Sequence, residues 1–158
     1  MRELILLRHA HAEPALPGQS DFDRPLAPHG VLEAEAAGRW LVQHRLVPDR
    51  VLYSPARRTR ETLEAVVGVT GYVEQCLEES IYEATAGTLI GLADAHRDVD
   101  RLLLLGHNPG LERLAALLHS GSSSQYRGMP PGSIAVLAFA SEGPVEPGAA
   151  TLSAFWWP

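Results

Sequence analysis

Short apolar runs alternate along this chain with longer stretches in which apolar residues recur at helical spacing. The runs are continuous, which is typical of strands that are covered on both faces of a sheet. The strands predicted in this way cover residues 3–7, 50–53, 102–105, 134–139 and 151–156. Helical spacing predicts helices at 30–46, after Ser54-Pro55, at 88–96 and from Asn108-Pro109-Gly110 onward. The stretch 72–81 fits neither pattern clearly.

Turn-forming residues separate these elements. Pro48-Asp49 ends the first helix. At the start of the second helix we expect Ser54 to cap the helix and Pro55 to occupy its first turn. Residues 10–29 and 120–131 are rich in small polar residues, Gly and Pro and predict loops. Long loops in compact domains tend to be functional, so the first of them draws particular interest.

The alternation of strands and helices indicates an α/β fold. We expect a three-layer sandwich in which a mostly parallel sheet carries helices on both faces. With 158 residues the chain is the size of one domain, so the prediction is a single domain over residues 1–158. In sheets of this kind ligands bind at the carboxyl ends of the strands, which is where functional residues are expected.

Composition and charge exclude several classes of function. No apolar run approaches the roughly 20 residues that a membrane span needs, and the charged start of the chain is unlike a signal peptide. Cys76 is the only cysteine, so no internal disulfide and no structural zinc site is expected, and the location expected is cytoplasmic. The formal net charge of -6 argues against nucleic acid as a partner.

Three of the predicted strands end directly at polar residues that can do chemistry. Arg8-His9 follows the first strand, the segment 54–60 follows the second, and Gly106-His107-Asn108 follows the run of four leucines. All three should meet at one edge of the sheet. Two histidines with at least two arginines suit phosphoryl transfer, because a neutral imidazole can attack phosphorus while guanidinium groups hold its oxygens.

These residues also carry a resemblance to a known family. Leu7-Arg8-His9-Ala10 resembles the Arg-His-Gly/Ala signature of the histidine phosphatase superfamily. Residues 54–62 resemble that superfamily's Ser-Pro-x-x-Arg-Ala-x-Gln-Thr segment, and residues 106–111 resemble the second-histidine motif of the small SixA-type phosphohistidine phosphatases. The three motifs follow one another in the family's order. The resemblance implies a phosphoglycerate mutase-like fold and a phosphatase that uses no metal or other cofactor.

Roles follow from the resemblance position by position. His9 matches the nucleophile that becomes phosphorylated, and His107 matches the second catalytic histidine. Arg8 and Arg58 match the phosphate-binding arginines, and Arg58 rather than Arg57 lies four residues after the serine as the family pattern requires. We expect Arg8, Arg58 and His107 to bind the phosphoryl group while His9 attacks it.

A proton donor for the leaving group is harder to find. Glu79 and Glu83 lie in the right region and are the candidate acids, but neither belongs to a recognisable motif. An alkoxide needs a proton in the transition state, whereas imidazole, whose conjugate acid titrates near 6.5, leaves more easily. The sequence therefore favours a phosphohistidine-bearing protein of a phosphorelay or phosphotransfer system as the substrate.

Other interpretations stay open at this point. A small phosphorylated metabolite is the alternative substrate within the same class, and a phospho-binding module without turnover is the alternative outside it. A metal-dependent hydrolase built on His9 and His11 is disfavoured, because alternate residues of an extended segment point apart. The segment 129–133 either borders the active site or is a plain turn into the next strand.

Overall fold

One mixed sheet organises the chain. The structure is a computed structural model, and it describes residues 1–124 and 128–158. Within these residues six strands pair in the order β3-β2-β4-β1-β5-β6. The strands are β1 (Glu3–Arg8), β2 (Arg50–Tyr53), β3 (Glu74–Leu77), β4 (Arg101–Gly106), β5 (Ile134–Phe139) and β6 (Ala150–Trp156). Strands β3, β2, β4 and β1 run parallel to one another. Strand β5 pairs antiparallel with β1, and β6 pairs antiparallel with β5. The expected mostly parallel sheet is confirmed.

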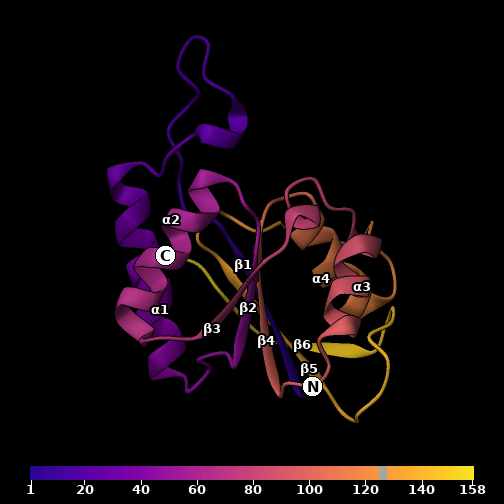
Figure 1. Cartoon of the computed structure of the whole chain (residues 1–158). Helices are drawn as coiled ribbons and strands as arrows, with labels where there is room; N and C mark the ends of the chain where they lie inside the picture. The colour runs from indigo at the N-terminus through magenta and orange to yellow at the C-terminus, as the bar shows by residue number, and fades with distance from the viewer. Residues whose placement is uncertain (125–127) are drawn as a thin grey trace.

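Helices cover both faces of this sheet, which confirms the three-layer α/β fold (Figure 1). Helices α1 (Pro28–Gln43) and α2 (Arg57–Thr70) lie together on one face. Helices α3 (Ala86–Ala95) and α4 (Gly110–Ser120) lie on the other. Two short 3₁₀ helices, η1 (Asp21–Asp23) and η2 (Glu79–Ile81), lie in the connections. Among the described residues, no helix combines the length and apolar character needed to cross a membrane.

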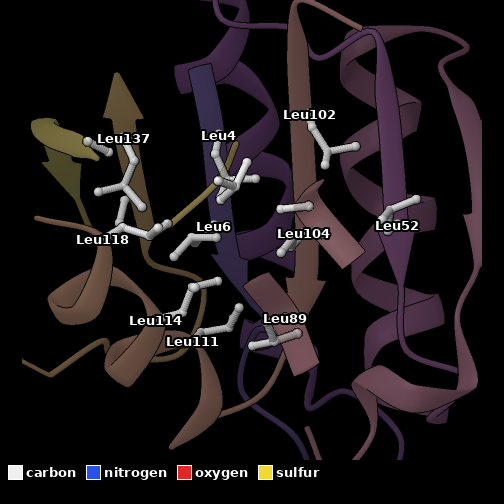
Figure 2. Close-up of a cluster of buried hydrophobic side chains, with 14 of the residues drawn as sticks. Leu4, Leu6, Leu52, Leu89, Leu102, Leu104, Leu111, Leu114, Leu118 and Leu137 are labelled. Atoms are coloured by element: carbon white, nitrogen blue, oxygen red, sulfur yellow. The ribbon is translucent and has the colours of Figure 1, made fainter. Parts of the chain in front are cut away.

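The continuous apolar runs are explained by burial on both sides of the central strands. Leu4 and Leu6 of β1 pack with the α3/α4 layer, as Figure 2 shows, whereas Ile5 and Leu7 face the α1/α2 layer. Each of these side chains is at most 1% exposed. Burying a side chain of this size stabilises a fold by about 1.5–3 kcal/mol, so the two layers are held to the same strands. The strand ends are therefore rigid supports.

Several boundaries differ by one to three residues from the sequence prediction, most clearly those of α1. Helix α1 begins at Pro28, two residues before the predicted start, because Pro is well suited to the first helical turn. It ends at Gln43 rather than continuing to residue 46. The ambiguous stretch 72–81 contains β3 and η2. β3 lies at the edge of the sheet and is largely exposed, which explains its lack of an apolar run.

Candidate active site

The carboxyl ends of three adjacent parallel strands bring the predicted residues together. His9 follows β1, His107 follows β4, and Arg58 lies in the first turn of α2, shortly after β2. The imidazole rings of His9 and His107 have centroids 5.2 Å apart. The side chain of Arg58 lies against both rings, and all three residues are at most 9% exposed. The strand-end rule thus placed residues from distant parts of the chain at one point.

Arg58 connects the two histidines through its guanidinium group. Its Nε donates to Nε2 of His9 at 3.3 Å, and one terminal nitrogen lies 3.3 Å from Nδ1 of His107. Since arginine is only a donor, both imidazole nitrogens act as acceptors in these contacts. The guanidinium group of Arg58 therefore donates to the lone pairs of both imidazole rings.

The protonation of His9 follows from its other ring nitrogen. Nδ1 lies 2.7 Å from the carbonyl oxygen of Ala10, and only an N–H group can make a hydrogen bond there. The proton therefore resides on Nδ1 and the lone pair on Nε2. Burial lowers the pKa of His9 to about 4, and the nearby cations Arg58 and Arg8 act in the same direction. His9 is neutral at pH 7, with its nucleophilic nitrogen directed toward Arg58.

His107 has the opposite tautomer. Its Nδ1 accepts from Arg58, so its Nε2 carries the hydrogen and donates to Oγ of Ser54 at 2.8 Å. Burial lowers the pKa of His107 to about 3, with His9 and Arg58 adding to the effect. His107 is therefore also neutral at pH 7.

The expected capping role of Ser54 is wrong. Helix α2 begins at Arg57, its N-cap is Ala56, and no side chain caps it. Oγ of Ser54 instead accepts from the backbone N–H of Ala56 and contacts His107. The local Ser-Pro pattern predicts that the hydroxyl of Ser54 caps the helix, but this hydroxyl hydrogen-bonds with the distant residue His107 instead.

Arg8 brings a second guanidinium group to the site. One terminal nitrogen donates to the carbonyl oxygen of Met129 at 2.8 Å, so the segment 129–133 does border the site. Its buried Nε has no hydrogen-bond partner within the described part of the chain. A buried donor without a partner is costly, and an anion bound beside it would satisfy it.

Two residues that sequence reasoning missed hold Arg58 in place. Asp21 in η1 accepts from Arg58 through its backbone oxygen at 2.8 Å and through Oδ2 at 3.1 Å. The hydroxyl of Tyr82 donates to the same Oδ2 at 2.6 Å. The Tyr82 and Arg24 hydrogen bonds hold the pKa of the Asp21 carboxyl well below its usual range, so it is ionised at neutral pH. The only signal in the sequence was that Asp21 lies in the long polar loop.

A cleft of about 700 Å³ opens beside His107. Its walls come from residues 82–87 on one side and from the start of α4 with Arg113 on the other. Of the two candidate acids, Glu83 lines this cleft, whereas Glu79 lies exposed in η2 and does not. In the described structure no hydrogen bond joins either glutamate to His9 or His107. The structure thus brings Glu83, but not Glu79, to the edge of the site.

The structure does not form a metal pair from His9 and His11. Both ring nitrogens of His9 have partners, in Ala10 and Arg58. His11 is exposed and directs Nδ1 to the carboxylate of Glu33, 2.9 Å away. The ring of His9 contacts Ala10 and Arg58, whereas the ring of His11 contacts Glu33 on α1.

Comparison with known proteins defines the class to which this site belongs. The sequence model of the histidine phosphatase superfamily (branch 1) matches residues 4–112, which span His9, Arg58 and His107. The chain belongs to the histidine phosphatase superfamily. Its family and its phosphatase neighbours support a phosphatase activity.

Individual relatives narrow the comparison to one branch. Phosphohistidine phosphatase SixA of Escherichia coli is 30% identical over 127 residues, which cover 77% of this chain and 76% of that protein. An uncharacterized protein of Mycobacterium tuberculosis is 39% identical over 158 residues, which cover 94% of this chain and 98% of the relative. The crystal structure of a candidate SixA from Agrobacterium tumefaciens is 30% identical, with a TM-score of 0.85 over 99% of this chain and 98% of that one. The chain is thus similar to SixA-type proteins over nearly its whole length.

Proposed function

We propose that this chain is a protein phosphohistidine phosphatase that works through a phosphorylated His9. The observation that carries the proposal is the state of His9: a buried, neutral imidazole whose Nε2 lone pair faces the guanidinium of Arg58. A neutral imidazole is the form that can attack phosphorus. The similarity to SixA-type proteins supports the same chemistry.

The catalytic sequence has two steps. In the first, the phosphoryl group takes hydrogen bonds from the guanidinium groups of Arg58 and Arg8, which releases the lone pair on Nε2 of His9. That lone pair forms a bond to phosphorus while the bond to the leaving group breaks and its electron pair departs with that group. In the second, water attacks the phosphohistidine, the bond to His9 breaks, and inorganic phosphate leaves. The guanidinium groups stabilise the charge of both transition states.

The electrostatics of the site favour a phosphohistidine substrate. Asp21 is ionised and fully engaged with Arg58 and Tyr82, so it is no proton donor at neutral pH. His107 is neutral, and its N–H points to Ser54 rather than to a substrate. A substrate imidazole that carries a proton on its second nitrogen leaves as a neutral base and needs no such donor. An alkoxide would need one.

The cleft beside His107 has room for a phosphorylated side chain of a protein as well as for a small metabolite. It is open, and it can accept a side chain presented on a surface loop or helix. We propose that the partner is a phosphohistidine-bearing protein of a phosphorelay or phosphotransfer system, and that hydrolysis needs no metal or other cofactor. One observation favours a small phosphomonoester as the second candidate: Glu83 lines the cleft, from which it could protonate a leaving oxygen.

Trapping the intermediate tests the mechanism. The protein is incubated with a ³²P-labelled phosphohistidine protein, quenched in base and mapped by peptide analysis. Label that is stable to base but labile to acid should appear on His9 and should be absent from His9→Ala. His44→Ala, which changes an exposed histidine just beyond the end of α1, is the matched control and should be labelled normally. Label on another residue, or normal turnover by His9→Ala, contradicts the proposal.

A comparison of substrates tests the leaving-group argument. We expect kcat/KM for the phosphohistidine protein to exceed that for a phosphoserine peptide and a sugar phosphate at least 100-fold. A general acid raises a rate by about 100-fold or more, and hydrolysis of the two esters would lack this contribution. Glu83→Gln should leave the phosphohistidine reaction unchanged, and EDTA should not alter the rate. If the esters are better substrates and Glu83→Gln impairs their hydrolysis, the small-molecule alternative is correct.

A further inference from the structure

A second cluster of chemically capable side chains lies outside the phosphoryl site. His11 follows the nucleophile segment, and His29 and Glu33 lie on the first two turns of α1. In the described part of the chain this is the one group of three such residues whose donor atoms, one from each, all lie within 4.8 Å of one another. The proposed phosphatase chemistry uses none of the three.

The donor atoms of His11 and Glu33 already lie within a few tenths of an ångström of the separation of two ligands on one metal ion. Nδ1 of His11 lies 2.9 Å from Oε1 and 3.0 Å from Oε2 of Glu33. These are hydrogen-bond distances, and two ligands about 2.1 Å from a tetrahedral ion lie about 3.4 Å apart, so the pair would open by a few tenths of an ångström around an ion. The rings of His11 and His29 have centroids 4.6 Å apart, so the third ligand is beside the first two.

The backbone already holds the three residues in this arrangement. His29 and Glu33 are four residues apart on one helix, so their side chains share a face. The backbone N–H of His11 donates to Oε1 of Glu33 at 3.0 Å, and its carbonyl oxygen accepts from the N–H of Ala27 at 2.9 Å. Gly30 leaves room for that carbonyl, because a Cβ there would collide with it. Little ordering is needed for an ion to bind.

We propose that His11, His29 and Glu33 form a binding site for one divalent transition-metal ion of the zinc class. Two imidazoles and one carboxylate suit Zn²⁺, Co²⁺ and Ni²⁺ rather than Mg²⁺ or Ca²⁺, which prefer an all-oxygen shell. Both histidines are exposed, so water completes the coordination. The ion loses no electron and breaks no bond; it cross-links the segment after His9 to helix α1.

Cobalt spectroscopy on tag-free protein tests the site directly. Titration with Co²⁺ should give visible d–d absorption that saturates at one ion per chain and is displaced by Zn²⁺. His29→Ala and Glu33→Gln should each weaken binding at least tenfold, about 1.4 kcal/mol per tenfold. His44→Ala is the control, because His44 directly follows the same helix and lies outside the group, and it should bind as the wild type does.

Thermal unfolding supplies a readout independent of colour. A ligand that binds only the folded state raises stability, so Zn²⁺ at a hundredfold excess over its Kd should raise the Tm by about 5–10 °C. His29→Ala should fold with an unchanged Tm in EDTA but lose the increase, which separates loss of the site from loss of the fold. Absence of stoichiometric absorption, or equal binding and equal Tm shifts in wild type and His29→Ala, overturns the proposal. A Tm increase with Mg²⁺ equal to that with Zn²⁺ also overturns the proposal.

Discussion

Mild acid should destabilise this protein strongly, because His9 and His107 are buried in the neutral form. The pKa of His9 lies at about 4 and that of His107 at about 3, below the 6.5 of an ordinary histidine. In the unfolded chain both imidazoles take up a proton as the pH falls below 6.5, whereas the folded chain takes up neither until the pH approaches 4. The unfolded state binds more protons in this window, so stability falls as the pH drops.

The magnitude follows from the shifts. At pH 5 about 97% of unfolded imidazoles are protonated, against roughly a tenth or less of the folded ones, which costs about 2 kcal/mol for each histidine relative to pH 7. The interaction between the two rings matters little, because both are still neutral in the folded state at pH 5. The expected loss is about 4 kcal/mol, a large part of the roughly 5–15 kcal/mol of a typical domain.

Urea unfolding at pH 7, 6 and 5 in phosphate-free chloride buffer measures this loss. His9→Asn keeps an N–H donor near Ala10 but removes the titrating group, so its stability should fall by only about 2 kcal/mol over the same range. His44→Asn, an exposed control, should follow the wild type. An equal pH dependence in wild type and His9→Asn would refute the inference that His9 is held neutral by burial.

Three substitutions test the geometry of the site and its supports. Arg58→Ala should lower kcat/KM for a chromogenic phosphate ester about 100-fold or more, whereas Arg57→Ala, which changes an exposed neighbour, should stay within about twofold. Asp21→Ala should lower kcat about tenfold, since Arg58 loses its side-chain partner; unchanged kinetics would show that the backbone contact suffices. Gly30→Ala should destabilise the fold by about 1–3 kcal/mol in urea unfolding, because the methyl group collides with backbone. Gly68→Ala, in open space on α2, should instead stabilise it by about 0.5–1 kcal/mol, and equal effects would contradict the packing argument.

The part of the site that follows strand ends could be predicted from the sequence. His9 and His107 come directly after continuously apolar runs, and the topology of a parallel sheet carries such positions to one edge. The resemblance to the superfamily's motif, in which the arginine lies four residues after the serine, singles out Arg58 within the segment 54–60. These predictions depend on local patterns, on that resemblance and on one general rule of sheet topology.

The rest depends on contacts that no local pattern records. Asp21 reaches Arg58 across 37 residues and Tyr82 across 61, and both lie where short 3₁₀ turns give no periodic signal. Ser54 was misread for the opposite reason: its local pattern was familiar, but His107, 53 residues away, competes for the hydroxyl. The sequence therefore indicates which residues meet at the candidate site, but not which residues position them.

The cleft beside His107 extends beyond the residues of the proposed reaction. Arg58 and His107 line it, and so do residues 83–87 and Arg113, which make no hydrogen bond to His9 or Arg58 among the described residues. Substitutions in the wall from Ala84 to Gly87 could therefore change which partner fits without altering the nucleophile or its charge environment. A protein built in this way can acquire new substrates by gradual change at the rim, while the chemistry at its centre is inherited intact.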